Sequence, residues 1–268
     1  MLGCLTGGNQ MNPFAEFQAI YVMWLRQMKR FIRSKGRLVS SVVQPLFFLV
    51  ILGFGFRAIT IPGFGDIDYI DFLTPGIIAM AIIFSSMFTG ISVLWDKQFG
   101  FLQEVLVAPV RRFSIIIGRT LGGATTALIQ GCIILLIGIG LGVHITSISG
   151  ILLTFVFMIS IAFSWVGLGL VIASKMEDFQ GFQLIMNLII MPLFFSSSTF
   201  FPLQNVDIPE IFRQIIQFNP MFYMVDGLRG SLIGQYNVNP PLYNLGIVIV
   251  FALIMMSLGS YFFSRSEV

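Results

Sequence analysis

Six long apolar runs constrain this chain more than any other feature of its sequence. A helix needs about 20 residues to cross roughly 30 Å of hydrocarbon. Runs of that length lie at 38–56, 73–95, 115–141, 148–173, 182–203 and 242–263. The strand-like alternation of a membrane β-barrel does not recur, and a helix satisfies its own backbone hydrogen bonds in lipid. We therefore predict an all-α membrane protein with six transmembrane helices.

The few charged residues indicate how these helices are oriented. Only 10% of the 268 residues are charged, against about 25% in a soluble domain. If the N-terminus is inside, three of the 15 Lys and Arg fall outside (Arg57, Arg213 and Arg229) and the other twelve fall inside. The positive-inside rule then predicts a multi-pass protein of the cell membrane with both termini in the cytoplasm. The basic clusters flank apolar runs, so nucleic-acid binding is excluded.

Cysteine and histidine indicate neither a metal site nor a catalytic centre. Cys4 and Cys132 are far apart in the sequence and form no ligand pattern. His144 is expected alone in a short outer loop, next to neither a cysteine nor a carboxylate, and receives no catalytic role. Because no His, Cys or carboxylate cluster is visible at one membrane depth, we expect a chain that is not itself an enzyme.

The residues before the first run fall into two parts. Residues 1–12 are polar and Gly-rich, and we expect a leader that is disordered or non-native. Residues 13–37 show helical periodicity, with an apolar arc that includes Phe17 and Phe31 and a basic face. We predict an amphipathic interfacial helix with a lipid-facing aromatic side, whose cations contact lipid headgroups; an anchor that only sets the topology fits equally well. The basic face consists of Arg26, Lys29, Arg30 and Arg33.

The charged segment between the second and third runs, 96–112, is the strongest indication of function. On a helical wheel it has one apolar face and one polar face. Such a helix lies in an interface and can present a docking surface to a soluble partner; a connector that only contacts lipid is the alternative. The residues of the expected contact are Asp96, Lys97, Gly100, Phe101, Leu102, Glu104, Val105, Leu106, Pro109, Arg111 and Arg112.

Polar residues within the runs are candidates for a substrate path. They are Gln44, Ser85, Ser86, Thr89, Asn187, Ser196, Ser197 and Thr199. Hydroxyl groups and small residues also let membrane helices pack closely, as the pair Gly118 and Gly122 would, so helix packing is the competing interpretation for each.

The connection between the fifth and sixth runs is too long for a turn and too apolar for a disordered loop. Its prolines separate short helical stretches, and we predict two re-entrant or interfacial helices on the outer side, within 203–241. Asp226 and Arg229 are three residues apart, which would make them neighbours on one helix and a candidate ion pair.

Two segments resemble those of a known family: DKQFGFLQEVLVAPVRR after the second run and FFPLQNVDIPEIFRQIIQFNPMFYMVDGLRGSLIG after the fifth. Together they are similar to the membrane subunits of ABC-2-type exporters, and the resemblance extends from Met11 to the C-terminus. It implies a dimer with a second copy or a paralogue, driven by two cytoplasmic ATP-binding subunits. The segment 96–112 would be the coupling helix, and Glu177 and Asp178 a second contact. The outer motif comprises Pro202, Asn219, Pro220, Asp226 and Arg229.

A separate polypeptide has to supply the ATPase. The chain contains no GxxxxGK[ST] phosphate loop, so ATP and Mg²⁺ belong to the partner and we expect no cofactor in this chain. The stretch FNPMFYMVDGLRG resembles the drug and antibiotic efflux branch, which implies export of an amphipathic or lipid-like substrate. A polysaccharide or teichoic-acid exporter is the alternative within the family. A non-transporting scaffold or an ATP-independent channel is the alternative outside it.

Overall fold

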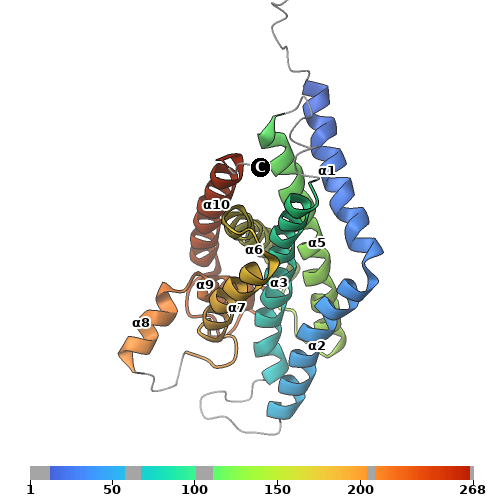
Figure 1. Ribbon diagram of the computed structural model, residues 1–268. Helices are drawn as coiled ribbons and strands as arrows, with labels where there is room; N and C mark the ends of the chain where they lie inside the picture. The colour runs from blue at the N-terminus through green and yellow to red at the C-terminus, as the bar shows by residue number, and fades with distance from the viewer. Residues whose placement is uncertain (1–12, 58–67, 101–110, 204–208, 266–268) are drawn as a thin grey trace, which may run out of the picture.

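The computed structural model describes residues 13–57, 68–100, 111–203 and 209–265, which form helices and no β-strand (Figure 1). The predicted all-α membrane architecture is confirmed. Five of these helices are long and apolar enough to cross a membrane, and a sixth, α7 (Phe179–Phe195), is apolar but shorter. The five are α2 (Lys35–Arg57), α3 (Tyr69–Gln98), α5 (Arg112–Gly140), α6 (Ile148–Lys175) and α10 (Pro241–Arg265).

The fifth apolar run differs most from its prediction. A span over 182–203 was expected, but α7 ends at Phe195. The Ser196 and Ser197 hydroxyls donate to the carbonyls of Pro192 and Phe194 at 2.7 and 2.6 Å, and Ser198 has a positive φ of 58°. Such local bonds from side chain to backbone compete with helix continuation. Four hydroxyl residues, 196–199, follow Phe195 before the sequence becomes apolar again, and the chain turns at them.

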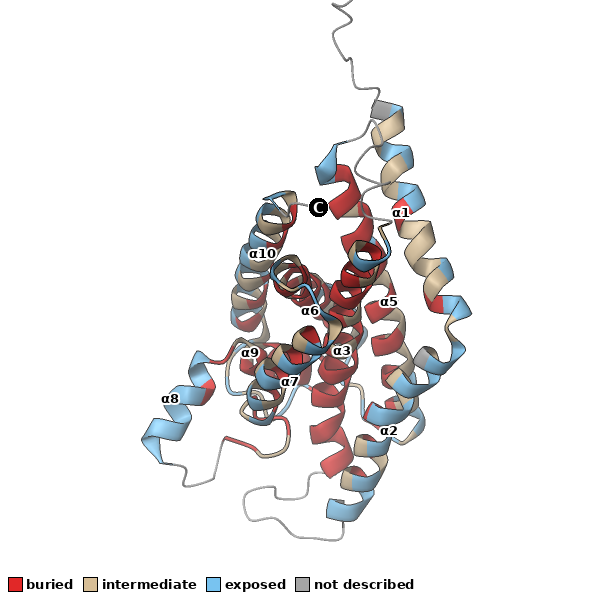
Figure 2. Ribbon diagram, viewed as in Figure 1, coloured by how far each residue is buried: buried red, intermediate tan, exposed pale blue. Residues whose placement is uncertain are grey.

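Helix α3 forms the centre of the bundle. It is buried along most of its length and contacts α2, α5, α6, α7 and α9, whereas α2 and α10 expose much of their surface (Figure 2). The contact with α6 is close because a Cβ atom at Gly90 would lie 2.5 Å from the Gly169 carbonyl oxygen. Backbones approach this closely only where side chains are missing.

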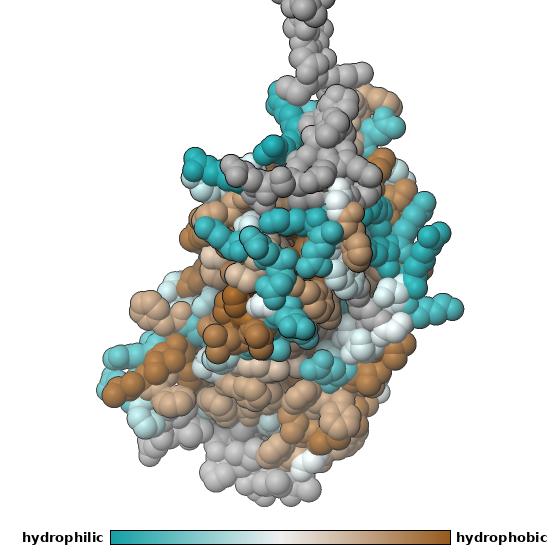
Figure 3. Space-filling view, viewed as in Figure 1, coloured by the Kyte–Doolittle hydropathy of each residue, from teal (hydrophilic) through white to brown (hydrophobic). Residues whose placement is uncertain are grey.

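The two ends of the bundle differ in composition. The start of α1 (Pro13–Arg33), the end of α3, the start of α5 and the end of α10 lie together at one end (Figure 1). We call this the basic end, and it carries Arg26, Lys97, Arg112, Lys175 and Arg265. Figure 3 shows hydrophilic side chains gathered over this half of the visible face, and mostly apolar side chains over the other half. We call the opposite end the distal end.

Helix α1 packs along α5. A Cβ atom at Gly118 or Gly122 would lie 2.7 Å from atoms of α1, so this pair of small residues lets α1 approach the α5 backbone. The Trp24 indole also donates to the Thr125 hydroxyl at 3.1 Å. Only part of the apolar arc of α1 is therefore free to face lipid: Phe17 is exposed, whereas Phe31 is buried.

Two helices occupy the region between α7 and α10. Helix α8 (Glu210–Phe218) projects from the bundle and exposes apolar side chains such as Ile211 and Phe218, whereas most of α9 (Pro220–Leu232) is buried (Figure 2). The segment expected to hold two re-entrant or interfacial helices thus holds one exposed helix, α8, and one mostly buried helix, α9.

Candidate functional site

One buried carboxylate joins three helices at the basic end. Asp96, in the last turn of α3, is only 4% exposed. It accepts hydrogen bonds from both terminal nitrogens of Arg26 in α1, at 3.0 and 2.7 Å. Its second oxygen lies 2.7 Å from Nη2 of Arg119 in α5, and Arg30 Nη1 lies 3.5 Å from the first. Within the described ranges, three guanidinium groups thus share one carboxylate, and positive charge is in excess.

Asp96 was expected at the surface as part of a partner contact, but the structure places it in the interior. Any contribution that it makes to coupling therefore has to pass through its arginine partners. From the sequence, Arg26 and Arg30 were expected on a basic face toward lipid headgroups, Arg119 had no predicted role, and none of the three was connected with Asp96. Arg119 alone could have indicated the cluster from the sequence, because it lies inside the apolar run 115–141 and a charge there requires a partner.

The flanks of the candidate coupling segment are attached to the bundle by further bonds. Glu16 of α1 accepts from the Arg111 amide at 3.1 Å and from the Ser114 hydroxyl, so it caps the N-terminus of α5. Arg112 donates to the Ser264 carbonyl near the end of α10 at 2.7 Å. The Gln98 side chain donates to the Glu177 carbonyl at 3.2 Å. These contacts connect the segment to α1, α10 and the turn before α7.

The other expected coupling residues are only partly described. Lys97 and Gly100 are half-buried, and Arg111, Arg112, Glu177 and Asp178 are exposed. Gly100 adopts a φ of 72°, which glycine tolerates without strain, and Asp178 caps α7 by accepting from the Gly181 amide at 2.7 Å. The remaining expected residues lie outside the described part of the chain: Phe101, Leu102, Glu104, Val105, Leu106 and Pro109.

The candidate path residues do not converge within one copy of the chain. Ser85 and Thr89 face a cavity of about 20 Å³ between α1, α3 and α5, which is large enough for about one water molecule. Ser86, Ser197 and Thr199 are buried, and Thr199 packs directly against Gly76. Ser196 is half-buried, and Gln44 and Asn187 are exposed on α2 and α7.

Asp226 and Arg229 do not form the expected direct ion pair. Both are fully buried in α9, and each has partners elsewhere. Asp226 accepts from the amides of Val238 and Asn239 at 2.8 and 3.0 Å and from the Asn244 side chain at 2.8 Å. Because α9 is surrounded by protein, its two charged side chains contact different neighbouring groups.

Arg229 bonds to different elements. Its Nη2 donates to the Ser198 carbonyl at 2.9 Å, and its guanidinium carbon lies 3.8 Å from the centroid of the Phe72 ring, a cation–π distance. It thereby ties α9 to α3 and to the turn after α7.

The other motif residues support the same region. Asn219 caps α9 by accepting from the Met221 amide at 2.9 Å, and its side chain donates to the Leu193 carbonyl at 2.6 Å. Pro220 occupies the first helical position, where no amide donor is needed. Pro202 is buried.

Comparison with known proteins identifies the family. The sequence model described as "ABC-2 type transporter" matches residues 18–233, from α1 to the end of α9. The chain belongs to this family. It is 27% identical to the inner membrane transport permease YadH of Escherichia coli over 87% of this chain and 90% of that protein. It is 25% identical to the putative transport permease ycf38 of Cyanophora paradoxa over 82% of this chain and 76% of that protein. It is 23% identical to nodulation protein J of Rhizobium leguminosarum bv. trifolii over 85% of this chain and 84% of that protein.

In this ABC-2 transporter, His144 does have a carboxylate neighbour, contrary to expectation. Its backbone amide donates to Asp71 at 3.1 Å, and its Nδ1 lies 3.0 Å from the other oxygen of the same carboxylate. The two residues are 73 positions apart, so sequence proximity gave no sign of the pair. The imidazole is 83% exposed. No group of three potential metal ligands forms within the described ranges.

Proposed function

We propose that this chain is the transmembrane subunit of an ATP-driven exporter. Its basic end would face the cytoplasm, where separate ATP-binding subunits dock on the segment 96–112 and on Glu177 and Asp178. Family membership carries this proposal. The ion pairs and hydrogen bonds at both ends of the segment 96–112 support it. They connect the segment with α1, α3, α5 and α10, so a force on the segment would reach these helices directly.

In this mechanism, closure of the ATPase dimer pushes on the coupling segment. Asp96 passes the displacement to α1 and α5, while Glu16 and Arg112 pass it to α1 and α10. Packed helices respond by shifting as rigid bodies, because interfaces repack between discrete arrangements rather than stretch.

The transport route would lie between two permease copies. The cavity that Ser85 and Thr89 face within one copy is too small for any cargo. Gln44 on α2 and Asn187 on α7 are exposed among apolar residues, and uncovered polar side chains are unfavourable in lipid. A second copy or a paralogue that covers these faces would remove that cost and place the two residues along a shared path. An amphipathic or lipid-like substrate, such as a drug, an antibiotic or a lipid, fits a path with this mixture of side chains.

Reconstitution tests the proposal. The permease is co-expressed and co-purified with a candidate ABC-type ATP-binding subunit, and ATP-dependent uptake into inverted vesicles is measured for lipids, drugs and glycans. Uptake of a drug or lipid supports the proposal, whereas uptake of glycans alone supports a polysaccharide exporter. Uptake without ATP indicates a channel. Stable binding with neither uptake nor substrate-stimulated ATPase activity indicates a scaffold.

Charge reversal tests the docking surface separately. Arg111→Glu and Glu104→Lys should each weaken binding of the ATP-binding subunit and reduce ATP-driven uptake. Arg213→Glu on exposed α8 is the matched control, because it reverses one charge at the opposite end. If both coupling variants bind the subunit and transport as well as the control, the docking assignment is wrong.

A further inference from the structure

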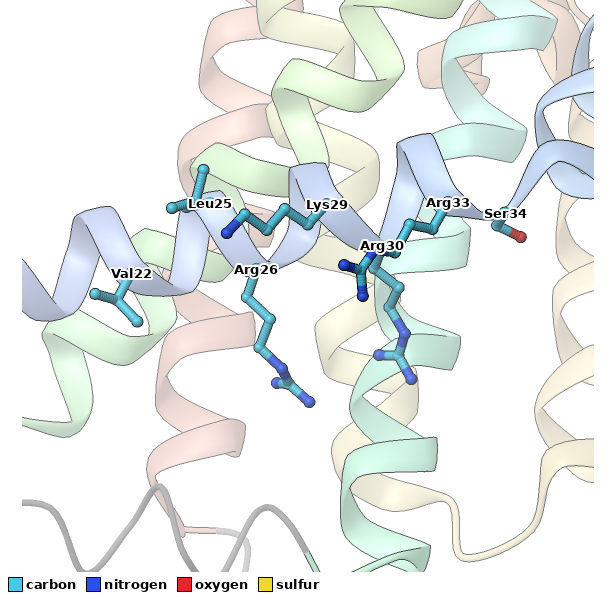
Figure 4. A pocket seen from close by; sticks show the side chains of 7 residues that line it. All are labelled: Val22, Leu25, Arg26, Lys29, Arg30, Arg33 and Ser34. Atoms are coloured by element: carbon cyan, nitrogen blue, oxygen red, sulfur yellow. The ribbon is translucent and has the colours of Figure 1, made fainter.

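An open groove of about 710 Å³ lies beside α1 at the basic end. Within the described part of the chain, its lining comes from α1 and the residue that follows it, Ser34 (Figure 4). Val22 and Leu25 supply apolar surface, and four cations, Arg26, Lys29, Arg30 and Arg33, supply charge. Figure 4 shows Arg26 and Arg30 extending from the same side of the helix.

In the part of the chain that the structure describes, the cations at this groove outnumber the carboxylates that contact them. Among the described residues, the ion pairs of the groove cations converge on Asp96, which Arg119 also contacts from behind. Arg26 and Arg30 keep 32% and 30% of their side-chain surface exposed, while Lys29 and Arg33 are exposed residues. An arrangement of many cations around one carboxylate attracts a further anion.

We propose that this groove binds the phosphate headgroup of an anionic phospholipid from the leaflet that meets the basic end. A lipid is favoured over a soluble anion because apolar side chains continue from the groove along α1. Tyr21 and Val22 are each 51% exposed, and Ile32 is 62% exposed. Acyl chains can cover these residues while the phosphate meets the cations, as in other interfacial helices.

The four cations have different roles in this site. Arg26 is oriented by its two bonds to Asp96, and Arg30 lies over the Trp95 ring at 5.2 Å, so both present pre-positioned donors. Lys29 and Arg33 carry no such constraint and add attraction at the rim. A bound phosphate also offsets the excess positive charge around Asp96, so it stabilises the junction of α1, α3 and α5.

Lipid competition on the full-length purified chain tests the site. Native mass spectrometry measures how many phosphatidylglycerol and phosphatidylcholine molecules stay bound from an equal mixture. The double variant Lys29→Gln/Arg33→Gln removes two rim charges without touching the Asp96 cluster. At about 1 kcal/mol per cation near a membrane surface, we expect roughly 30-fold weaker retention of phosphatidylglycerol. The control Lys175→Gln/Arg265→Gln removes two charges from the same end on α6 and α10, and it should retain the lipid.

Three outcomes would overturn the proposal. Equal retention of both lipids by the unmodified chain would show no preference for an anionic headgroup. Equal losses in the two double variants would show a general charge effect rather than a site. Complete displacement of phosphatidylglycerol by millimolar inorganic phosphate, or by the ATP-binding subunit, would assign the groove to a soluble anion or to a protein contact. The lipid readout needs no transport activity, so it can fail while the exporter function holds.

Discussion

The bundle buries charge at both of its ends, but in two different ways. At the basic end, three arginines from two helices share the carboxylate of Asp96 on a third helix. At the distal end, Asp226 and Arg229 stand on one helix and do not share partners. Asp226 binds two backbone amides and one amide side chain, and Arg229 binds a carbonyl and an aromatic ring.

The two ends differ in whether one partner of the buried carboxylate can take the place of another. Long arginine side chains can exchange around a common carboxylate while α1, α3 and α5 shift, so the basic cluster tolerates movement. Backbone amides held by Asp226 occupy fixed positions, so the distal set holds the start of α10 in one geometry. We infer that the basic end is suited to transmit motion and the distal end to resist it.

Removal of the shared carboxylate should have the largest effect. Asp96→Ala leaves three cations together, one of them, Arg119, only 3% exposed. Loss of one partner from a buried ion pair costs roughly 3–5 kcal/mol. Thermal unfolding in detergent, followed by size-exclusion chromatography, should show a strongly lowered midpoint or no folded protein. A midpoint within a few degrees of the unmodified chain would mean that Asp96 does not hold the three helices together.

The distal carboxylate should be slightly less costly to replace. Asp226→Asn keeps the shape, but its amide nitrogen would meet another donor and its remaining oxygen cannot satisfy all three partners. Loss of charged hydrogen bonds of this kind costs about 1.5–3 kcal/mol. Hydrogen exchange should speed up at the amides of Val238 and Asn239. Unchanged exchange at both amides would contradict the fixed geometry inferred for this end.

The helices were predictable because apolar length alone specifies a membrane span. The limits of that rule appear after Phe195, where α7 stops at four hydroxyl residues inside the run that was expected to span the membrane. Serine hydroxyls that bond to nearby carbonyls end the helix there, and hydropathy does not register hydrogen bonds. The packing of α1 against α5 also depended on two glycines, Gly118 and Gly122, whose partner helix the sequence leaves open.

The candidate site was less predictable, since its contacts join distant residues. Asp96 belongs to the predicted coupling segment, but its partners Arg26 and Arg119 come from helices that meet it only in the folded bundle. The same holds for His144 and Asp71. For Asp226 and Arg229 the spacing was misleading, because helical neighbours pair only when nothing better is available. The centre of the coupling segment, 101–110, lies outside the described residues, so its prediction stands untested.

A matched pair of arginine replacements sharpens the comparison between the ends. Both Arg119 and Arg229 are almost completely buried. Arg229→Met strands the Ser198 carbonyl and should cost about 2 kcal/mol. Arg119→Met leaves Asp96 with Arg26 and relieves the positive excess, so it should cost about 1 kcal/mol or less. Equal losses in the two unfolding midpoints would show that the shared carboxylate offers no redundancy.

The smallest effect is expected from the most distant of the shared arginines. Arg30 Nη1 lies 3.5 Å from Asp96, and the side chain is 30% exposed, so Arg30→Gln should cost less than about 1 kcal/mol. The same replacement removes a pre-positioned donor from the groove, so retention of phosphatidylglycerol should fall even though the unfolding midpoint barely moves. If the unfolding midpoint and lipid retention both fell steeply, the main role of Arg30 would be to stabilise Asp96 rather than to bind lipid. The exchange of arginines around one carboxylate would then be too limited to let α1 move.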